Sequence, residues 1–346
     1  MEPRGPAPAL DPDPAATPPP VPAVRPRSLS SWPGWLAVLL GGMTLLAGVG
    51  GADLVASGQL PTADPQVFVV AIVAGAALFV GGLAFLAVRG IVRRRHLPMH
   101  RYRGPSVVLL LVLGVTVASL AAIPFVADVA AIFGGGGEPS VLGSLALLTS
   151  TQVGLLLVTF LFVALPRALA GAPPLDGGAP LRSLRLGLAY GALAWLASSA
   201  LVVLLVLLLT AAGLQPPTQP AEEALAIVNP LVVVLAVVIV APIAEEVFYR
   251  GVAYTAWMRE RGRTFALVAS SLLFAVSHLA LPDATLAGFA AGVVLLIPFF
   301  GLGLGLGLVY QMTGSLLAAI VMHATINGIS VGIAMLYRFD VIRLPT

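Results

Sequence analysis

The hydrophobic pattern divides the chain into nine long apolar segments separated by short polar loops. Apolar runs of about 20 residues with almost no charge are typical of membrane-spanning helices, whereas strands of a membrane β-barrel are shorter and alternate in polarity. The sequence therefore predicts an all-α fold, a polytopic transmembrane helical bundle with about eight to nine spans. The segments lie at residues 34–52, 66–88, 105–127, 141–165, 186–212, 227–244, 264–281, 286–310 and 314–336.

Two of these segments need comment. The first, at 34–52, is short and rich in glycine, so it is the weakest candidate for a full span. The sixth is followed by polar residues, and we expect its helix to continue through them beyond residue 244.

The polar content of the chain changes twice along its length. Residues 1–31 are rich in proline and alanine without apolar periodicity, which predicts a disordered cytoplasmic tail. Residues 32–220 hold transmembrane helices that carry no recognised motif. Residues 221–346 form a C-terminal transmembrane bundle that carries the polar groups discussed below.

Composition supports a membrane protein and excludes some chemistry. The chain is 59% hydrophobic and 10% charged, whereas soluble domains carry about a quarter charged residues. It contains no cysteine, which excludes disulfides, thiol nucleophiles and cysteine-ligated metals. All its basic residues except histidine are arginine, which, with abundant alanine, glycine and proline, indicates a GC-rich bacterial genome. The high isoelectric point comes from arginines beside apolar segments, so it predicts contact with the lipid bilayer and no nucleic-acid partner.

The loop charges predict an orientation. Arginine clusters follow the second, fourth and sixth segments, at residues 89–103, 167–185 and 250–263, and the intervening loops carry only acids. By the positive-inside rule, the N-terminus is cytoplasmic in a multi-pass protein of the cell membrane. Nine spans then place the C-terminus outside, where Arg338 and Arg343 are in mild conflict with the rule.

Strongly polar side chains at membrane depth are concentrated near the end of the chain. Such groups are costly in a bilayer and usually functional, and the first five segments carry essentially none. This asymmetry predicts a functional site in the C-terminal bundle. The residues are Glu245, Glu246, Arg250, His278, His323 and Asn327.

Their spacing predicts which of them meet. Glu246 and Arg250 are four residues apart, so they share a helix face and can pair. Glu245 points about 100° away from Glu246 and is left to face another environment. His323 and Asn327 are also four apart and share a face. A bundle can bring such polar faces together at one cavity.

These residue types suit hydrolysis. A carboxylate in a partly dry cavity has a raised proton affinity and can act as a general base toward water. A histidine or asparagine can donate a hydrogen bond to the oxyanion of a tetrahedral intermediate. Glu245, His278 and His323 also form a residue set that can bind zinc, so metal-free and metal-assisted versions both stay open. The structural alternatives are a surface ion pair and polar contacts between packed helices.

Three short motifs resemble those of the CPBP intramembrane proteases, also called the CAAX protease and bacteriocin-processing or Abi family. They are Glu245-Glu246-Val-Phe-Tyr-Arg250, Phe274-Ala-Val-Ser-His278 and His323-Ala-Thr-Ile-Asn327. The resemblance covers about residues 225–336 and includes Gly251 and Thr313-Gly-Ser315.

The resemblance implies an intramembrane endopeptidase that cleaves peptides or membrane proteins. It implies that Glu245 activates the attacking water with help from His278, that His323 and Asn327 stabilise the oxyanion, and that Glu246 and Arg250 support the site. Members are usually labelled metalloproteases, and zinc is the candidate cofactor. We do not carry over the prenylcysteine substrate of the eukaryotic relative. We expect the site to lie toward the cytoplasmic leaflet, because Glu245 is expected at the cytoplasmic end of its helix.

Two other functions remain open at this point. The chain could be a non-catalytic bacteriocin-immunity or membrane binding factor, in which case Glu245→Ala leaves its phenotype intact. It could also be a proton-coupled transporter, because buried glutamate and histidine can relay protons. The glycine repeat Gly301-Leu-Gly-Leu-Gly-Leu-Gly307 predicts close helix packing within the bundle, with a dimer interface as the alternative.

Overall fold

The computed structural model describes most of the C-terminal 317 residues, and these are helical except for short connections. The expected disordered tail, 1–31, lies outside the described residues apart from its last two positions. The described ranges are 30–56, 59, 64–98, 101–122, 140–169, 179–213, 228–278 and 286–339.

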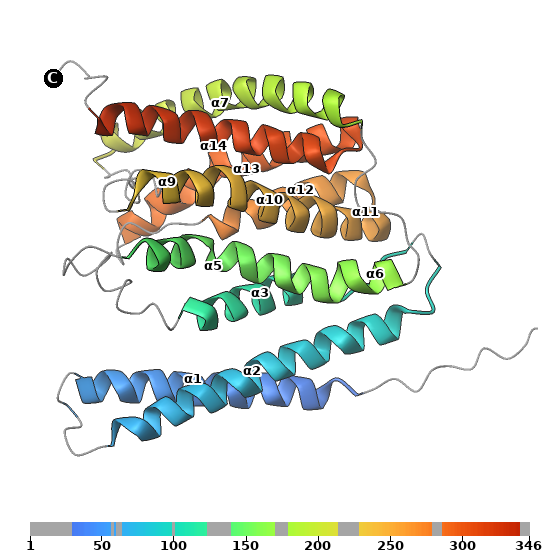
Figure 1. Ribbon diagram of the computed structural model, residues 1–346, viewed down its shortest axis with the longest axis vertical. Coiled ribbons are helices and arrows are strands. Elements are labelled where there is room, and N and C mark those ends of the chain that lie inside the picture. Colours follow the sequence, from blue (N-terminus) through green and yellow to red (C-terminus); the bar gives the residue numbers. More distant parts are fainter. Residues whose placement is uncertain are drawn as a thin grey trace, which may run out of the picture. The chain divides into compact units, whose positions relative to one another are not determined.

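The all-α polytopic bundle predicted from the sequence is confirmed (Figure 1). In the described part of the chain, seven helices are long and apolar enough to cross a membrane. Two further apolar helices, Val107–Ser119 and Arg263–Ser277, are shorter. Each of the nine predicted segments therefore corresponds to a helix.

The first two helices form a close antiparallel pair (Figure 1). They are α1 (Trp32–Ala56) and α2 (Pro65–Arg94). Gly48 and Gly82 lie at the contact, and a Cβ at either would come within 2.8 Å of the partner helix backbone. Gly48, one of the glycines that made the first segment look weak, thus lets its backbone approach α2.

The next pair brings two further helical segments together. α3 (Val107–Ala122) packs against α5 (Val141–Thr159), which continues through η2 (Phe160–Ala164) into α6 (Leu165–Leu169). Ser140 caps α5 by accepting a hydrogen bond from the Gly143 amide at 2.9 Å.

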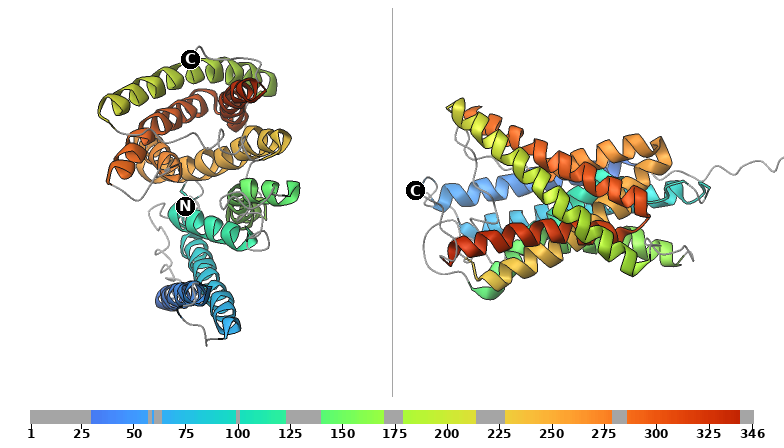
Figure 2. Two further views of the ribbon diagram at one scale, coloured as in Figure 1. Left: turned by 90° about the vertical axis from the view of Figure 1, so that its left-hand side faces the viewer. Right: turned by 90° about the horizontal axis from the view of Figure 1, so that it is seen from above.

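In the C-terminal half, α7 (Pro180–Ala211) lies along the last helix, α14 (Leu316–Arg338) (Figures 1 and 2). Their ends are joined by a buried hydrogen bond of 2.8 Å from Ser183 Oγ to Ser315 Oγ. Ser315 also caps α14, so its place before the His323 helix is structural.

The sixth segment continues as predicted and forms one helix over Pro230–Arg261. It is built from α9 (Pro230–Val233), η3 (Val234–Val240), α10 (Ala241–Glu246), η4 (Val247–Tyr254) and α11 (Thr255–Arg261). The η segments are π-helical, a form often found at functional sites.

This continuation corrects one premise of the sequence analysis. Glu245 does not lie at the end of its helix but near its middle, about 22 Å of helix from Pro230 at 1.5 Å per residue. The residues after it stay helical because they are mostly apolar and because Glu246 and Arg250 neutralise each other inside the bundle. The position of Glu245 in its helix therefore does not place the site near the cytoplasmic leaflet.

Two tight turns position the remaining helices. Gly262, with φ of 88°, joins α11 to α12 (Arg263–Ser277), and Gly314, with φ of 64°, joins α13 (Leu286–Thr313) to α14. Positive φ values of this kind favour glycine. Both turns reverse the chain within a residue or two, so the flanking helices run antiparallel.

The glycine repeat of α13 packs within the bundle. A Cβ at Gly303 would lie 2.9 Å from Ser271 Cα on α12, and one at Gly305 would lie 3.3 Å from the Met322 side chain on α14. The repeat thus brings α13 against both helices that carry the candidate histidines.

Gly303→Ala should therefore lower the free energy of unfolding. Overpacking against backbone typically costs about 1–3 kcal/mol, more than the helix propensity that alanine gains. The matched control is Gly301→Ala on the same helix, where a Cβ meets nothing within 4 Å. Unfolding of both variants in detergent would check this, and equal stability of the two would contradict the packing argument.

Candidate active site

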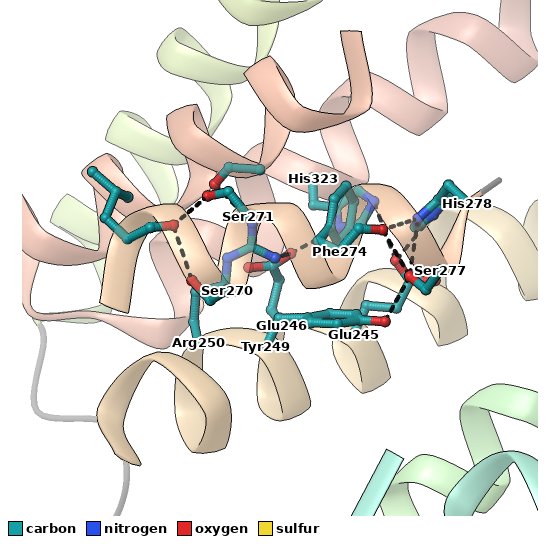
Figure 3. A network of polar contacts seen from close by, with 12 residues as sticks. Glu245, Glu246, Tyr249, Arg250, Ser270, Ser271, Phe274, Ser277, His278 and His323 are labelled. Carbon is teal, nitrogen blue, oxygen red and sulfur yellow. Dashed lines mark hydrogen bonds and ion pairs between the residues drawn. The ribbon is translucent and has the colours of Figure 1, made fainter. Parts of the chain in front are cut away.

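Three helices bring one glutamate and two histidines together (Figure 3). Oε2 of Glu245 lies 3.6 Å from Nε2 of His278 and 3.9 Å from Nε2 of His323. The three side chains come from α10, the C-terminal end of α12 and α14. The sequence analysis grouped these residues, and the structure brings them to a common point.

Glu246 lies beside this group and is completely buried. Its Oε1 accepts a hydrogen bond from Arg250 Nη1 at 2.8 Å and lies 2.9 Å from Nδ1 of His323. The predicted pairing of Glu246 with Arg250 is therefore correct. Its partner set also includes His323, which connects the ion pair to the group around Glu245.

Arg250 is the centre of the buried polar network. Its Nη2 donates to the Gly303 carbonyl at 3.0 Å, and its guanidinium lies 4.9 Å from the centre of the Phe274 ring. Both contacts cross between helices, so the charged side chain fixes α12 and α13 against the long helix. The ion pair with Glu246 offsets the high cost of burying the cation.

Aromatic rings fix the position of His278. The imidazole stacks on Phe299, with ring centres 4.8 Å apart, and lies 4.4 Å from the centre of Phe274. Its Nδ1 is 2.8 Å from the Phe274 carbonyl oxygen. Next to it, Ser277 accepts a 2.7 Å hydrogen bond from the Tyr249 hydroxyl and donates to the same Phe274 carbonyl.

These partners determine which nitrogen of each neutral imidazole carries the proton. A carbonyl and a carboxylate can only accept, so Nδ1 is the donor in His278, toward Phe274, and in His323, toward Glu246. Each neutral ring then has its Nε2 lone pair on the side of Glu245. Three acceptor atoms facing one another favour a hydrogen-bond donor between them, such as water or a protonated substrate group.

Asn327 lies one turn beyond His323 and has a different partner. Its Nδ2 donates to the Val237 carbonyl in η3 at 2.8 Å. The structure gives no contact between Asn327 and Glu245. The side chain therefore connects α14 to the long helix, and this bond uses one of its two amide hydrogens.

The zinc hypothesis can be compared with this geometry. Glu245, His278 and His323 have suitable donor atoms, and each histidine donates its other nitrogen to an oxygen, as zinc-bound histidines do. However, among the described residues no three His, Asp or Glu side chains are placed so that they could hold a metal ion. We therefore derive no step through a metal, and zinc binding stays a prediction from the sequence.

The sequence was next compared with known proteins. Residues 227–329 match a family model described as Rce1-like, type II CAAX prenyl endopeptidase Rce1-like. This match agrees with the CPBP resemblance of the same region. The match includes all six candidate residues, from Glu245 to Asn327. No curated protein and no solved structure matches the chain.

The Rce1-like match has two consequences. Because the family is one of membrane-embedded endopeptidases, it implies a protease, a hydrolase that acts on peptide bonds. Together with the apolar helices, it indicates a multi-pass membrane protein. The match begins at the long helix, so helices α1 to α7 lie outside it.

Several residues of the candidate site were not singled out from the sequence. Tyr249 and Ser277 stand inside the quoted motifs, and their position there was the available signal. Phe299 lies on α13, whose polar residues, Tyr310, Gln311 and Thr313, stand near its C-terminal end and drew no attention to it. Gly303 belongs to the glycine repeat noted in the sequence, but the bond from Arg250 to its carbonyl was not predicted.

Proposed function

We propose that this chain is an intramembrane endopeptidase in which Glu245 and His278 activate a water molecule. The observation that carries the proposal is the convergence of two Nε2 atoms on one oxygen of Glu245, at 3.6 and 3.9 Å. These distances are too long for direct hydrogen bonds, but one water can lie within hydrogen-bond distance of the carboxylate and of His278 at the same time. The Rce1-like match supports the same reaction class.

The reaction then follows from the atoms present. The water gives one proton to Glu245 while its oxygen attacks the carbonyl carbon of the scissile peptide bond. His278 accepts the second hydrogen bond and holds the water in line. The protonated Glu245 then transfers its proton to the leaving amine as the C–N bond breaks, which regenerates the carboxylate.

The developing oxyanion needs a donor on the opposite side of the scissile carbon. We assign this role to His323 in its imidazolium form, which differs from the neutral ring described above in that Nε2 also carries a proton, while Glu246 accepts from Nδ1. Asn327 is the second donor in this proposal, with the amide hydrogen that Val237 does not use. Glu246 and Arg250 act as positioning residues, because they fix the ring of His323 without touching substrate.

The substrate is a peptide segment of a membrane protein or a membrane-associated peptide. A site near the middle of a 32-residue helix suits a substrate that enters from within the bilayer. We place the protein in the cell membrane with a cytoplasmic N-terminus, following the arginine distribution in the loops.

The metal question has a direct test. In the proposed reaction Glu245 and His278 activate the water without a metal, so we expect purified protein to cleave substrate after dialysis against a chelator, with the rate within about twofold of the untreated rate. Metal analysis of the same sample checks that zinc has been removed. Loss of activity on chelation, restored by zinc, would instead support the metalloprotease alternative with Glu245, His278 and His323 as ligands.

The proposed reaction can be tested on purified full-length protein in lipid nanodiscs. Peptides derived from membrane proteins are incubated in water enriched in oxygen-18, and new peptide ends are identified by mass spectrometry. The proposal predicts cleavage with the heavy oxygen in the new C-terminal carboxylate, and none with Glu245→Gln. Intact peptides with the wild type, while the protein remains folded, would favour a binding or immunity role.

A further inference from the structure

A second site lies at the end of the bundle where the arginines gather. A cavity of about 200 Å³ is formed there between α2, the segment 101–104, the η2–α6 region and the long helix. It is smaller than typical drug-sized pockets but far larger than a single water requires. None of the active-site side chains lines it.

The side chains that line this cavity carry an excess of positive charge. Five of the residues that line it are arginines, and none of its lining residues is acidic. The neighbouring acid on α11, Glu260, is 3.9 Å from Arg94, and neither residue lines the cavity. The arginines are Arg95, Arg101, Arg103, Arg167 and Arg259.

Among the described residues, two buried polar atoms of side chains that line the cavity have no hydrogen-bond partner. They are the hydroxyl of Tyr102, a side chain that is 8% exposed, and Nε of Arg103. Buried polar groups are nearly always hydrogen-bonded, so such atoms beside a cavity indicate a ligand. Burial raises the pKa of Tyr102, which keeps its hydroxyl protonated and able to donate. Both unpartnered atoms are therefore donors.

The chemistry of the ligand follows from these donors. Arginines and a hydroxyl donor, with no carboxylate among the described residues that line the cavity, suit an anion with several oxygens, above all a phosphate group. The walls also include apolar side chains, among them Ile91, Phe162 and Val252. The cavity thus combines anion recognition with an apolar surface.

Its position indicates the source of the phosphate. Arg95 directly follows α2, while Arg167 and Arg259 lie within the last residues of two other candidate spans. The ends of spans are where lipid headgroups lie. We propose that this cavity binds the phosphate of an anionic phospholipid, with the Tyr102 hydroxyl and the arginines as its donors.

The site has a direct connection to the catalytic helix. Gly251 and Val252, which line the cavity, follow Arg250 in the same turn of η4. A bound headgroup would therefore stabilise the helical turn that carries the buried ion pair. This proposal does not depend on the proposed reaction, because it concerns binding alone.

Binding can be measured on the delipidated full chain in a neutral detergent. Phosphatidylglycerol, phosphatidylcholine and inorganic phosphate are added separately, and the unfolding temperature is recorded against concentration. We expect phosphatidylglycerol to raise it and phosphatidylcholine to have no effect. If only inorganic phosphate raised the unfolding temperature, the cavity would bind a soluble phosphate compound, and the assignment to a phospholipid would be wrong.

Substitutions test whether the rise in unfolding temperature comes from binding in this cavity. Arg103→Gln should weaken the response to phosphatidylglycerol at least tenfold in concentration, whereas Arg182→Gln on α7, outside the cavity, should leave it unchanged. Tyr102→Phe should be as stable as wild type without lipid, because it removes an unpartnered hydroxyl, and should gain less from phosphatidylglycerol. Equal responses to both lipids and to phosphate, or a wild-type response in both Arg103→Gln and Tyr102→Phe, would overturn the proposal.

Discussion

Replacing Glu246 by leucine should destabilise the protein by about 3–5 kcal/mol, the usual cost of leaving a buried charge without its partner. Arg250 is fully buried, and its Nη1 is 2.8 Å from Glu246. The Gly303 carbonyl, its other polar partner, cannot neutralise the cation. The variant should also release the His323 ring, since Nδ1 loses its acceptor. Thermal or denaturant unfolding in detergent measures the loss.

Two further variants make this test specific. The double variant Glu246→Leu/Arg250→Met removes both charges and keeps apolar volume, so it should regain a large part of the lost stability. Glu260→Leu removes an exposed glutamate from the same helix and should change stability by no more than about 0.5 kcal/mol. A double variant no more stable than Glu246→Leu would show that the two side chains do not act as a pair.

Replacing Glu245 by glutamine should abolish most activity without unfolding the protein. A positioned general base contributes about 10²–10⁴-fold to a rate, and glutamine has the same shape but cannot take the proton. Oε2 of Glu245 is buried and has no hydrogen-bond partner, so removing its charge should leave the free energy of unfolding unchanged or raise it. The rate is measured with a peptide identified in the oxygen-18 experiment.

The matched control for this variant is Glu260→Gln, which changes the same residue type on the same helix at its exposed end. It should keep wild-type activity. If Glu245→Gln retained more than a tenth of the wild-type rate while Glu260→Gln behaved normally, Glu245 would not be the base.

The helical architecture was accessible from the sequence because it depends on length and polarity alone. The nine apolar segments each form a helix, and the i,i+4 spacing correctly paired Glu246 with Arg250. The position of Glu245 along its helix was placed wrongly, because the apolar run ends before it while the helix does not. The charged residues Glu246 and Arg250 interrupt the apolar run in the sequence, although they pair inside the bundle and the helix continues past them.

The meeting of Glu245 with His278 could have been predicted more sharply. Glu245 precedes the turn at Gly262 by 17 residues and His278 follows it by 16, so an antiparallel hairpin places them at the same height. The contact of Arg250 with Gly303 could not have been predicted in this way. It depends on the distance between α12 and α13, which is set by the absence of a side chain at Gly303.

The central claim is that Glu245 cleaves peptide bonds in or beside the membrane. Its most direct test compares the ends of membrane-protein fragments in cells that express wild type or Glu245→Gln at matched levels of folded protein. We predict new termini only with the wild type, in proteins with membrane segments. Identical termini in both, with the wild-type phenotype kept by Glu245→Gln, would contradict the claim and favour a binding or immunity function.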